Sequence, residues 1–509
     1  VVRYDVGRYD ERRDLIIDPL VFSTYLGGTD GDGGVDVTLD SERNVHVGGY
    51  TYSTSFPATS GVFDISYNGG SDIFIVRLNH NASSLIYGSF LGGAKNDYSW
   101  RIEIDNNSNI YLTGYTYSSD FPVTSNAYDK SFNGTTDAYA VKLNSSGDRL
   151  LYSTYIGGSE GDFVYKSLEV DSRHYVYIAG KTDSEDFPVT NGSYDVSFNH
   201  SDGFILKLNI SGDKVIYSTF LGGDGGEIIY SMNLKDDKIY VAGYTNSLNF
   251  PTSPNAYSRD RNGTGDAFIA VLSYDLTRLK YASLFGGSRG NSSYYDYATD
   301  IRVDDDGNIY ITGLTKSTDL PTTPGAFDRT FNGRTDVFMA KFNYDLSSLL
   351  YSTYIGGSLS EGFIEYIIIP IITIHNNQHI FIAGRTESSN FPITSDAFHK
   401  TYANAEGFLI CFNNSGTLIY STYVGGNQSE SVQGISIHSS YIYLTGGTRS
   451  TDFPITNNSY QTSLSGSSDA FVLKIYPFTP LAPKNLTAVP GNESVILRWE
   501  HNRRPWEIY

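Results

Sequence analysis

Six of the Gly-Gly pairs in this chain are followed, four positions later, by an acidic residue. These acids are Asp32, Asp97, Asp162, Glu227, Glu361 and Glu430, and one further pair has Asn291 at the same spacing. Carboxylate oxygens are the ligands that hard cations such as Ca²⁺ prefer, so six of them gathered in a ring would form a cation site. Carboxylates that stay apart would instead cap backbone N–H groups. The capping interpretation is favoured, because repeats usually duplicate structural parts.

A second group of chemically active residues lies in two insertions. After two of the Gly-Gly pairs the chain is about five residues longer than elsewhere, at 288–300 (SRGNSSYYDYATD) and 358–369 (SLSEGFIEYIII). The candidate binding residues there are Tyr294, Tyr295, Asp296, Tyr297, Glu365 and Tyr366. Aromatic faces beside carboxylates bind sugar rings and peptide anchors. The insertions therefore predict either a glycan- or protein-binding patch or loops that merely cover a neighbouring repeat.

Catalytic patterns are missing from the sequence. It has no nucleophile elbow, HExxH, P-loop or dinucleotide-binding fingerprint, so we predict no catalytic residue. An enzyme would have to use a carboxylate pair drawn from Asp296, Asp300, Glu361 and Glu365, for glycoside or polysaccharide chemistry. The single cysteine, Cys411, excludes an internal disulfide framework and a CxxC metal site, and we expect it to pack as a small apolar residue.

Composition limits the partners. The net charge of −20 argues against nucleic acid or an anionic membrane as the main partner, because both are polyanions. The most apolar run, at 364–374, has a glutamate and a proline and is too short to span a bilayer. Asn-x-Ser/Thr sequons, which are candidate N-glycosylation sites, occur at Asn81, Asn106, Asn133, Asn144, Asn191, Asn199, Asn209, Asn262, Asn291, Asn413, Asn427, Asn457, Asn485 and Asn492.

A repeat determines where all these residues must lie. The heptapeptide YSTYIGG at 152–158 recurs at 351–357, and looser copies bring the number to seven, spaced by 65, 65, 65, 64, 70 and 69 residues. Each unit has four β-rich runs bounded by Gly, Asn, Asp or Ser, and therefore predicts four antiparallel strands. Strands such as YVYIAG are apolar on both faces, which indicates sheets stacked face to face around an axis.

Counting strands predicts how the fold closes. The chain begins with a lone fourth strand and ends with a unit that has only three strands, so the first strand would complete the last sheet. The expected fold is all-β: a seven-bladed β-propeller of four-stranded antiparallel blades over 19–477, closed by the N-terminal strand in a 3+1 arrangement. The outer strands are expected to end near residues 28, 93, 158, 223, 287, 357 and 426.

These motifs resemble a known family. The combination of YSTYLGG-like strands, "D..GN.Y.tG.T.S.dFP.T..A" and "NG..DAF..KLN" is similar to the SBBP repeat, a seven-bladed β-propeller repeat of secreted and surface proteins of bacteria and archaea. Residues 1–18 resemble the tail of a preceding domain. After a linker at 478–484, residues 485–509 resemble the truncated start of a fibronectin type III domain. The chain is therefore expected to be a piece of a larger protein.

The resemblance implies an extracellular or cell-surface location and a non-catalytic role in structure, display or adhesion. The first alternative is a glycan- or protein-binding module that uses the two insertions, and the second is a polysaccharide-active enzyme. The expected partners are other surface proteins or glycans, with no nucleic acid and no direct membrane span. No cofactor is required, and Ca²⁺ is the ion expected if the acids bind a cation.

Overall fold

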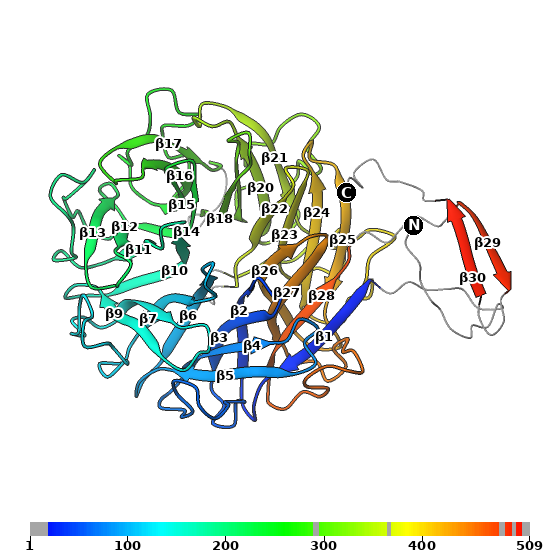
Figure 1. The fold of residues 1–509 in the computed structure, drawn as a ribbon. Coiled ribbons are helices and arrows are strands. Elements are labelled where there is room, and N and C mark those ends of the chain that lie inside the picture. Colours follow the sequence, from blue (N-terminus) through cyan, green and yellow to red (C-terminus); the bar gives the residue numbers. More distant parts are fainter. Residues whose placement is uncertain (1–18, 289–294, 364–367, 478–483, 491–494, 501–509) are drawn as a thin grey trace.

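The described part of the molecule consists of β-strands joined by turns and loops. The computed structural model describes residues 19–288, 295–363, 368–477, 484–490 and 495–500. Four-stranded antiparallel groups surround a centre, with the N-terminal strand β1 beside the last strands of the repeat region (Figure 1). The predicted all-β class and the four-stranded antiparallel sheets are confirmed. No helix in the described ranges has the length and apolar character needed to cross a membrane.

Each repeat contributes a first strand next to the centre and a second strand paired with it. The first strands are β2 (Asp32–Leu39), β6 (Asp97–Ile104), β10 (Asp162–Val170), β14 (Glu227–Lys235), β18 (Asp296–Val303), β22 (Ile371–His375) and β26 (Glu430–His438). The second strands are β3 (Val45–Thr51), β7 (Ile110–Thr116), β11 (Val176–Thr182), β15 (Lys238–Thr245), β19 (Ile309–Thr315), β23 (His379–Thr386) and β27 (Tyr441–Thr448).

Third and fourth strands complete the sheets toward the outside. The third strands are β4 (Asp72–Leu78), β8 (Asp137–Leu143), β12 (Asp202–Leu208), β16 (Asp266–Ser273), β20 (Asp336–Phe342), β24 (Glu406–Asn413) and β28 (Asp469–Ile475). The fourth strands are β5 (Leu85–Leu91), β9 (Leu150–Ile156), β13 (Val215–Leu221), β17 (Leu279–Phe285), β21 (Leu349–Ile355), β25 (Leu418–Val424) and β1 (Leu20–Leu26). Beyond them, β29 (Lys484–Pro490) and β30 (Val495–Glu500) form a separate two-stranded antiparallel sheet.

The strand order follows the repeat. The sheets run in chain order from first to fourth strand, for example β2-β3-β4-β5, and one sheet has the order β1-β28-β27-β26. In that sheet β1 pairs antiparallel with β28, with Thr24 opposite Val472. The first strands of consecutive sheets contact one another, from β2 and β6 round to β26 and β2. A single parallel bridge between Lys166 and Ser231 joins β10 to β14. The predicted tail 1–18 and most of the linker 478–484 lie outside the described residues.

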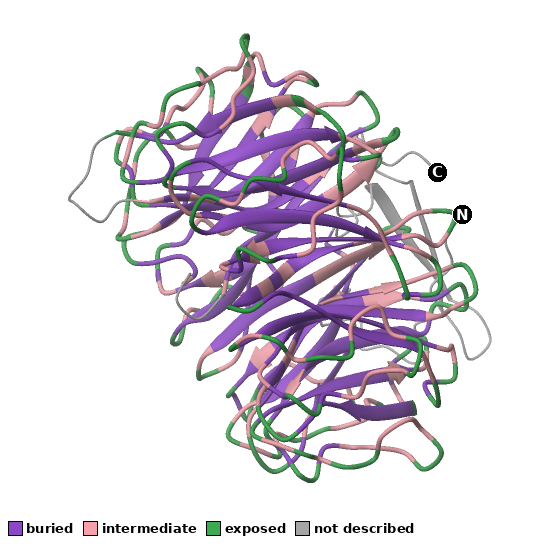
Figure 2. Cartoon of the chain, turned by 90° about the vertical axis from the view of Figure 1, so that its left-hand side faces the viewer, coloured by how far each residue is buried: buried purple, intermediate pink, exposed green. Residues whose placement is uncertain are grey.

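Apolar residues on both faces explain why the sheets stack. Every residue of β7 and of β8 is buried, because each face of that sheet is covered by a neighbouring sheet. The burial pattern is visible in Figure 2, where the strands are mostly buried and the exposed residues lie in turns and loops. Core clusters form between adjacent sheets, so one cluster combines Ile269 of β16 with Ile311 of β19 and Phe338 of β20.

The long segment between the second and third strands covers the outer edge of its own sheet. In the sheet β2-β3-β4-β5, Thr59 N–H donates to Gly88 O at 2.9 Å and Phe90 N–H donates to Asp64 O at 3.0 Å, so this segment pairs with β5. Its Phe56 is 3% exposed and stacks on Phe74 with ring centroids 4.4 Å apart. The segment thus satisfies polar groups at the edge strand and anchors itself in the core.

Most first strands carry a β-bulge at the same place. The register between β6 and β7 shifts between Ser99 and Arg101, which leaves Trp100 without an opposite residue. The same shift leaves Tyr230 unopposed in β14 and Gln433 unopposed in β26. A bulge redirects the side chain of its extra residue. The bulges therefore present an additional set of side chains close to the centre of the molecule.

Candidate binding site at the hinge face

The acids that follow the Gly-Gly pairs tie each fourth strand to the first strand of the next sheet. We call them the hinge acids, and the surface on which they lie the hinge face. In the hinge of Asp97, the N–H of Gly93 donates to Oδ2 at 2.7 Å, Ser118 Oγ–H donates to Oδ2 at 3.0 Å and Thr116 donates to Oδ1. The second glycine donates in this way to every hinge acid, at 2.7 to 3.2 Å. The hinge acids are Asp32, Asp97, Asp162, Glu227, Asp296, Glu361 and Glu430.

The structure gives each hinge acid the capping arrangement. All of them are buried, at 0 to 2% exposure, and their oxygens accept from glycine N–H and from Thr and Ser hydroxyls of the same hinge. Within the described ranges, no three His, Cys, Asp or Glu side chains are grouped so that they could hold a metal ion. The carboxylates of Asp32, Asp97, Asp162, Glu227, Glu361 and Glu430 therefore close individual hinges, and they do not face a common point.

The four-residue spacing does not identify one of the hinge acids. Asp296, predicted to belong to a binding patch, has 1% exposure. Its carboxyl accepts from Gly287 N–H at 2.9 Å, Thr315 Oγ1–H at 2.5 Å and Ser317 Oγ–H at 2.8 Å. Asp296 thus fills the place that the four-residue spacing gave to Asn291, because the insertion precedes the acid in this sheet. In the sheet of β22 the insertion follows Glu361, which keeps its spacing.

The other predicted patch residues divide into two groups. Tyr294, Glu365 and Tyr366 lie outside the described residues. Tyr295 and Tyr297 are half-buried at the hinge face and pack on Tyr244, with ring centroids 5.7 and 4.7 Å away. Of the acids considered for an enzyme, Asp300 is buried and forms an ion pair with Arg302 at 2.8 Å. It also accepts from Ile372 N–H at 2.8 Å and from Ser231 Oγ–H at 2.7 Å, so its contacts connect three sheets.

Tyr295 and Tyr297 belong to a continuous row of aromatic rings that the sequence analysis did not find. We call this row the aromatic arc. Successive contacting rings have centroids 4.7 to 6.3 Å apart. The arc spans five consecutive sheets, and many of its rings are half-buried or exposed. Its members are Tyr50, Tyr52, Tyr98, Trp100, Tyr115, Tyr117, Phe163, Tyr165, Tyr230, Tyr244, Tyr295 and Tyr297.

Two recurring sequence positions supply five rings of the arc. One is the residue directly before the final threonine of β3, β7 and β15, as in GYT, which supplies Tyr50, Tyr115 and Tyr244. This residue lies opposite the second residue of the first strand. The other is the bulged residue of the first strand, which supplies Trp100 and Tyr230. The tyrosines at the first position repeat visibly in the sequence, whereas the bulge has no local sequence signal.

Beside one end of the arc lies a hollow with two arginines, which we call the arginine pocket. It has a volume of about 490 Å³, and Arg385 and Arg449 line it together with Tyr50, Trp100 and Gln433. Arg385 lies over the ring of Phe363, with its guanidinium carbon 4.7 Å from the centroid, and is 3.4 Å from Glu387. Arg449 is exposed and forms no ion pair with a described residue. Among the described residues, the Arg385 guanidinium of the pocket thus has an ion-pair partner and that of Arg449 has none.

The axis is closed beneath this face. Lys166 is buried, and its Nζ donates to Gln433 O and, at 3.4 Å, to Val35 O, which lie on two other first strands. Burial lowers the pKa of Lys166 to about 8. The Lys166 side chain therefore connects three of the first strands across the centre, beneath the hinge face.

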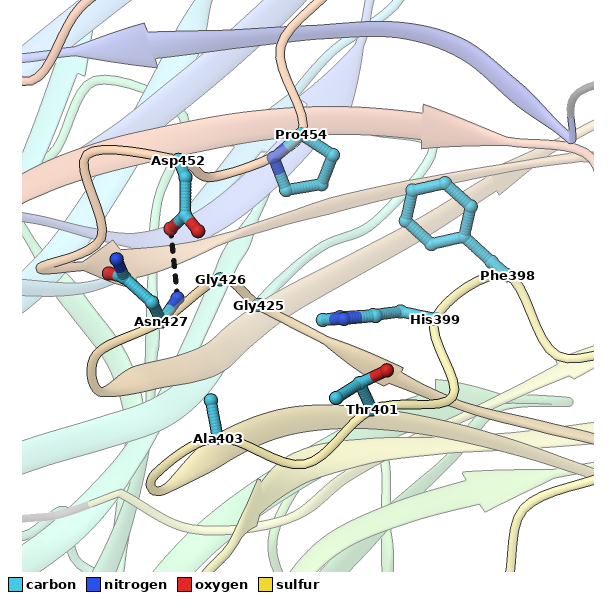
Figure 3. A pocket seen from close by; sticks show the side chains of 9 residues that line it. All are labelled: Phe398, His399, Thr401, Ala403, Gly425, Gly426, Asn427, Asp452 and Pro454. Carbon is cyan, nitrogen blue, oxygen red and sulfur yellow. Dashed lines mark hydrogen bonds between the residues drawn. The ribbon is translucent and has the colours of Figure 1, made fainter.

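A second hollow of about 490 Å³ lies beside the Gly425-Gly426 hinge (Figure 3). Figure 3 shows the ring of His399 facing the Gly425-Gly426 hinge, with Asp452 accepting from Asn427 N–H at 2.9 Å. Burial lowers the pKa of His399. His399 occupies the place that Asp64, Asp129 and Asp195 have in other repeats, and it replaces a turn-capping carboxylate there. This hollow has one basic side chain and no neighbouring aromatic arc, so it is a weaker candidate.

Comparison with known proteins supports the repeat. Four segments match the SBBP beta-propeller repeat. They are residues 21–57, 86–122, 151–188 and 280–321. They contain fourth strands, Gly-Gly hinges, first and second strands and the Phe-Pro or Leu-Pro dipeptides, and so support the predicted repeat family. No curated protein matches the chain.

Solved structures with a similar arrangement have very different sequences. BamB from Moraxella catarrhalis is 10% identical, with 90% of this chain and 100% of that chain covered and a TM-score of 0.37. The polysaccharide lyase Uly1 is 10% identical, with 87% and 90% covered and a TM-score of 0.46. The quinohemoprotein alcohol dehydrogenase from Comamonas testosteroni is 9% identical, with 94% and 80% covered and a TM-score of 0.39. These likenesses carry no argument about activity.

Proposed function

We propose that this chain is a non-catalytic, extracellular propeller that binds an acidic glycan at its hinge face, as an adhesion or display module. The finer architecture, seven blades closed by β1, is part of the proposal and is supported by the pairing of β1 with β28 and by the contacts between successive first strands. The exposed sequon asparagines, for example Asn81, Asn191 and Asn457, agree with an extracellular location.

The observation that carries the binding proposal is the arginine pocket at the end of the aromatic arc. Sugar rings bind to aromatic faces through their C–H surfaces, and guanidinium groups form paired hydrogen bonds with carboxylate or sulfate. Burial lowers the pKa of the Arg385 guanidinium, and the nearby charge of Arg449 lowers it further. An anion between them would relieve this repulsion. Because the chain has a net charge of −20, it repels anions overall. An acidic ligand would therefore bind through local contacts with these two arginines.

The arc also gives the ligand a direction. It continues from Tyr50 and Trp100 at the pocket through Tyr165 and Tyr230 to Tyr297, across several sheets. A polymer with an acidic unit in the pocket would place its following units along these rings. The binding proposal therefore favours a chain-like glycan over a single sugar.

Binding of polygalacturonate, compared with its neutral methyl ester, tests the proposal. Affinity electrophoresis or calorimetry should show binding of the acidic polymer only, and R449Q should weaken it about tenfold or more, because a charge-assisted hydrogen bond contributes about 1.5 to 3 kcal/mol. R149Q makes the same charge change on an exposed turn between β8 and β9 and should leave binding unchanged. Equal binding of both polymers, or equal effects of the two variants, would contradict the proposal. Shortening of the polymer would support the enzyme alternative.

A further inference from the structure

The first glycine of every hinge lies between two buried carboxyl groups. One belongs to the hinge acid, and the other belongs to the residue that opens the third strand of the preceding sheet. A Cβ placed on that glycine would come within 3.0 Å of an oxygen of each of the two. The pairs are Asp32 with Asp469, Asp97 with Asp72, Asp162 with Asp137, Glu227 with Asp202, Asp296 with Asp266, Glu361 with Asp336, and Glu430 with Glu406.

The hydrogen-bond donors are divided unequally within a pair. Glu227 accepts from Thr245, Ser247 and Gly223 N–H, whereas its partner Asp202 accepts only from Asn199 N–H, at 3.1 Å on Oδ2. Oδ1 of Asp202 has no hydrogen-bond donor. It is the oxygen of Asp202 that lies beside Gly222, next to the carboxyl of Glu227. Both residues have 0% exposure. A fully buried carboxylate oxygen without a donor is costly.

The same deficit recurs around the molecule. Asp72 Oδ1, Asp336 Oδ1 and Glu406 Oε2 also lack a donor and face the partner carboxyl past the hinge glycine. In the pair of Asp336 and Glu361 the facing oxygens of both residues lack a donor. Among the described residues, no lysine, arginine or histidine forms an ion pair with any of these carboxyls. The pairs of Asp72, Asp202, Asp336 and Glu406 each lack one positive charge or one O–H donor. In the other three pairs the facing oxygens of Asp137, Asp266 and Asp469 accept backbone N–H groups.

We propose that each of these four carboxyl pairs holds a shared proton, so that the folded chain retains up to four protons at these hinges and is built for acidic surroundings. A proton on the less satisfied carboxyl converts its bare oxygen into a donor toward the hinge acid, whose other hydrogen bonds come from N–H and O–H groups of the hinge. The proton removes one of two like charges and satisfies the oxygen at the same time. This inference is independent of the proposed glycan binding.

A cation is a poorer occupant of the same place. Ca²⁺ takes six to eight oxygen ligands. The oxygens of the hinge acid already accept N–H and O–H donors, and the hinge glycine stands between the two carboxyls. A proton needs only the two facing oxygens.

The electrostatic surroundings act in the same direction. Burial, and then the neighbouring carboxyl, raise the pKa of Asp202 to about 7 and that of Asp296 to about 7. Burial also raises the pKa of every other member of the pairs. The pKa rises to about 6 for Asp32, Asp97 and Asp137, to about 7 for Asp72, Asp162, Asp336 and Glu406, and to about 8 for Glu361. The pKa values of Glu227, Asp266, Glu430 and Asp469 are raised as well.

The other titratable groups that face the pairs from neighbouring segments are mostly acidic or neutral. The carboxyls are those of Asp64, Asp120, Asp129, Asp195, Asp224, Asp328 and Asp452. The hydroxyls are those of Tyr25, Tyr50, Tyr67, Tyr139, Tyr155, Tyr244, Tyr354, Tyr402 and Tyr423. One guanidinium, that of Arg261, lies beside Asp266. Further carboxyls raise the affinity of the pairs for protons, and only Arg261 opposes this.

The sign of the pH dependence follows from these shifts. A carboxyl whose pKa is higher in the folded than in the unfolded chain stabilises the fold fully below its unfolded pKa of about 4, and this contribution is lost as the pH rises through the folded value. Stability should therefore fall as the pH rises from about 5 to about 8.

Thermal unfolding of the full chain between pH 5 and pH 8, in EDTA, tests the proposal. We expect the midpoint to fall as the pH rises. D202N supplies an amide donor that does not titrate, and should remove about a tenfold change of the unfolding constant per pH unit. The control E185Q changes an exposed carboxylate and should leave the slope unchanged. If D202N does not fold, infrared spectra of the unmodified chain at pH 6 should show a protonated carboxyl band that disappears on unfolding.

Three results would overturn the proposal. They are a midpoint that does not change with pH, the absence of a protonated carboxyl band from the folded chain at pH 6, and a midpoint at pH 8 that Ca²⁺ raises to its value at pH 5 and EDTA lowers again. The last result would mean that the pairs bind cations and not protons.

Discussion

Replacing Asp296 by alanine tests the assignment of the displaced hinge acid. The change leaves the N–H of Gly287 and the hydroxyls of Thr315 and Ser317 without their acceptor in a buried hinge. Each unsatisfied buried donor costs about 1 to 3 kcal/mol, and rotation of the two hydroxyls recovers part of this. We therefore expect D296A to lower the free energy of unfolding by about 3 to 5 kcal/mol, a large fraction of the stability of a typical domain.

The cost of D296A should depend on pH. Because burial raises the pKa of Asp296 to about 7, the wild-type carboxyl contributes most below pH 4 and progressively less as the pH rises through 7. The loss caused by D296A should thus be larger at pH 5 than at pH 8. D296N keeps an acceptor oxygen and should cost less than D296A, with a loss that varies less with pH.

Urea unfolding at pH 5 and pH 8 measures these differences, provided that tryptophan fluorescence and circular dichroism report the same transition. The matched control is N291A, which changes the residue that the four-residue spacing would have selected. The reasoning is refuted if D296A costs less than about 1 kcal/mol, or if N291A costs more than D296A. D296A should also weaken glycan binding, because Tyr295 and Tyr297 flank the residue it changes.

Three further predictions concern other parts of the molecule. F391A removes a ring that is 2% exposed and whose centroid is 4.6 Å from that of Phe408, and it should lower the free energy of urea unfolding by about 3 to 5 kcal/mol. A loss below about 1 kcal/mol would mean that the segment between the second and third strands of this sheet does not need this anchor. A chain that starts at Gly28 lacks β1 and leaves the edge of β28 unpaired; it should aggregate on size exclusion, and a peptide of residues 19–27 should reduce this, whereas a monodisperse, equally stable chain would contradict the closure by β1. K166M removes a buried amine whose pKa is lowered by burial, so the cost of burying its charge is lost. The stability of K166M relative to wild type should therefore be higher at pH 7 than at pH 10. The opposite order would show that the hydrogen bonds of Lys166 outweigh the cost of burying its charge.

The repeat made the strands and their order predictable. Seven copies of one heptapeptide located each fourth strand, and the lone copy at 22–28 led to the expectation that β1 pairs with β28. Strands with two apolar faces required sheets on both sides, which is how β7 and β8 are buried. Such inferences succeed because a motif that recurs in register reports the same local structure each time.

The candidate site was less predictable because it depends on departures from the repeat. Counting four residues from each Gly-Gly pair fails where an insertion precedes the acid, and only the contacts of Asp296 reveal the exchange with Asn291. The bulges that turn Trp100 and Tyr230 toward the centre depend on the pairing of two strands and leave no local pattern. Arg385 and Arg449 lie on neighbouring sheets and meet only in three dimensions.

The pairing of β1 with the end of the repeat region has a consequence for how the chain folds. Thr24 and Gln461, which are hydrogen bonded, are 437 positions apart in the chain. Closing a loop of this length costs about 5 kcal/mol of chain entropy, and so remote a contact forms late. During synthesis β1 remains unpaired until β28 has been made. Once joined, the two ends cannot separate without opening the edge of β28, so this contact should slow unfolding more than it speeds folding.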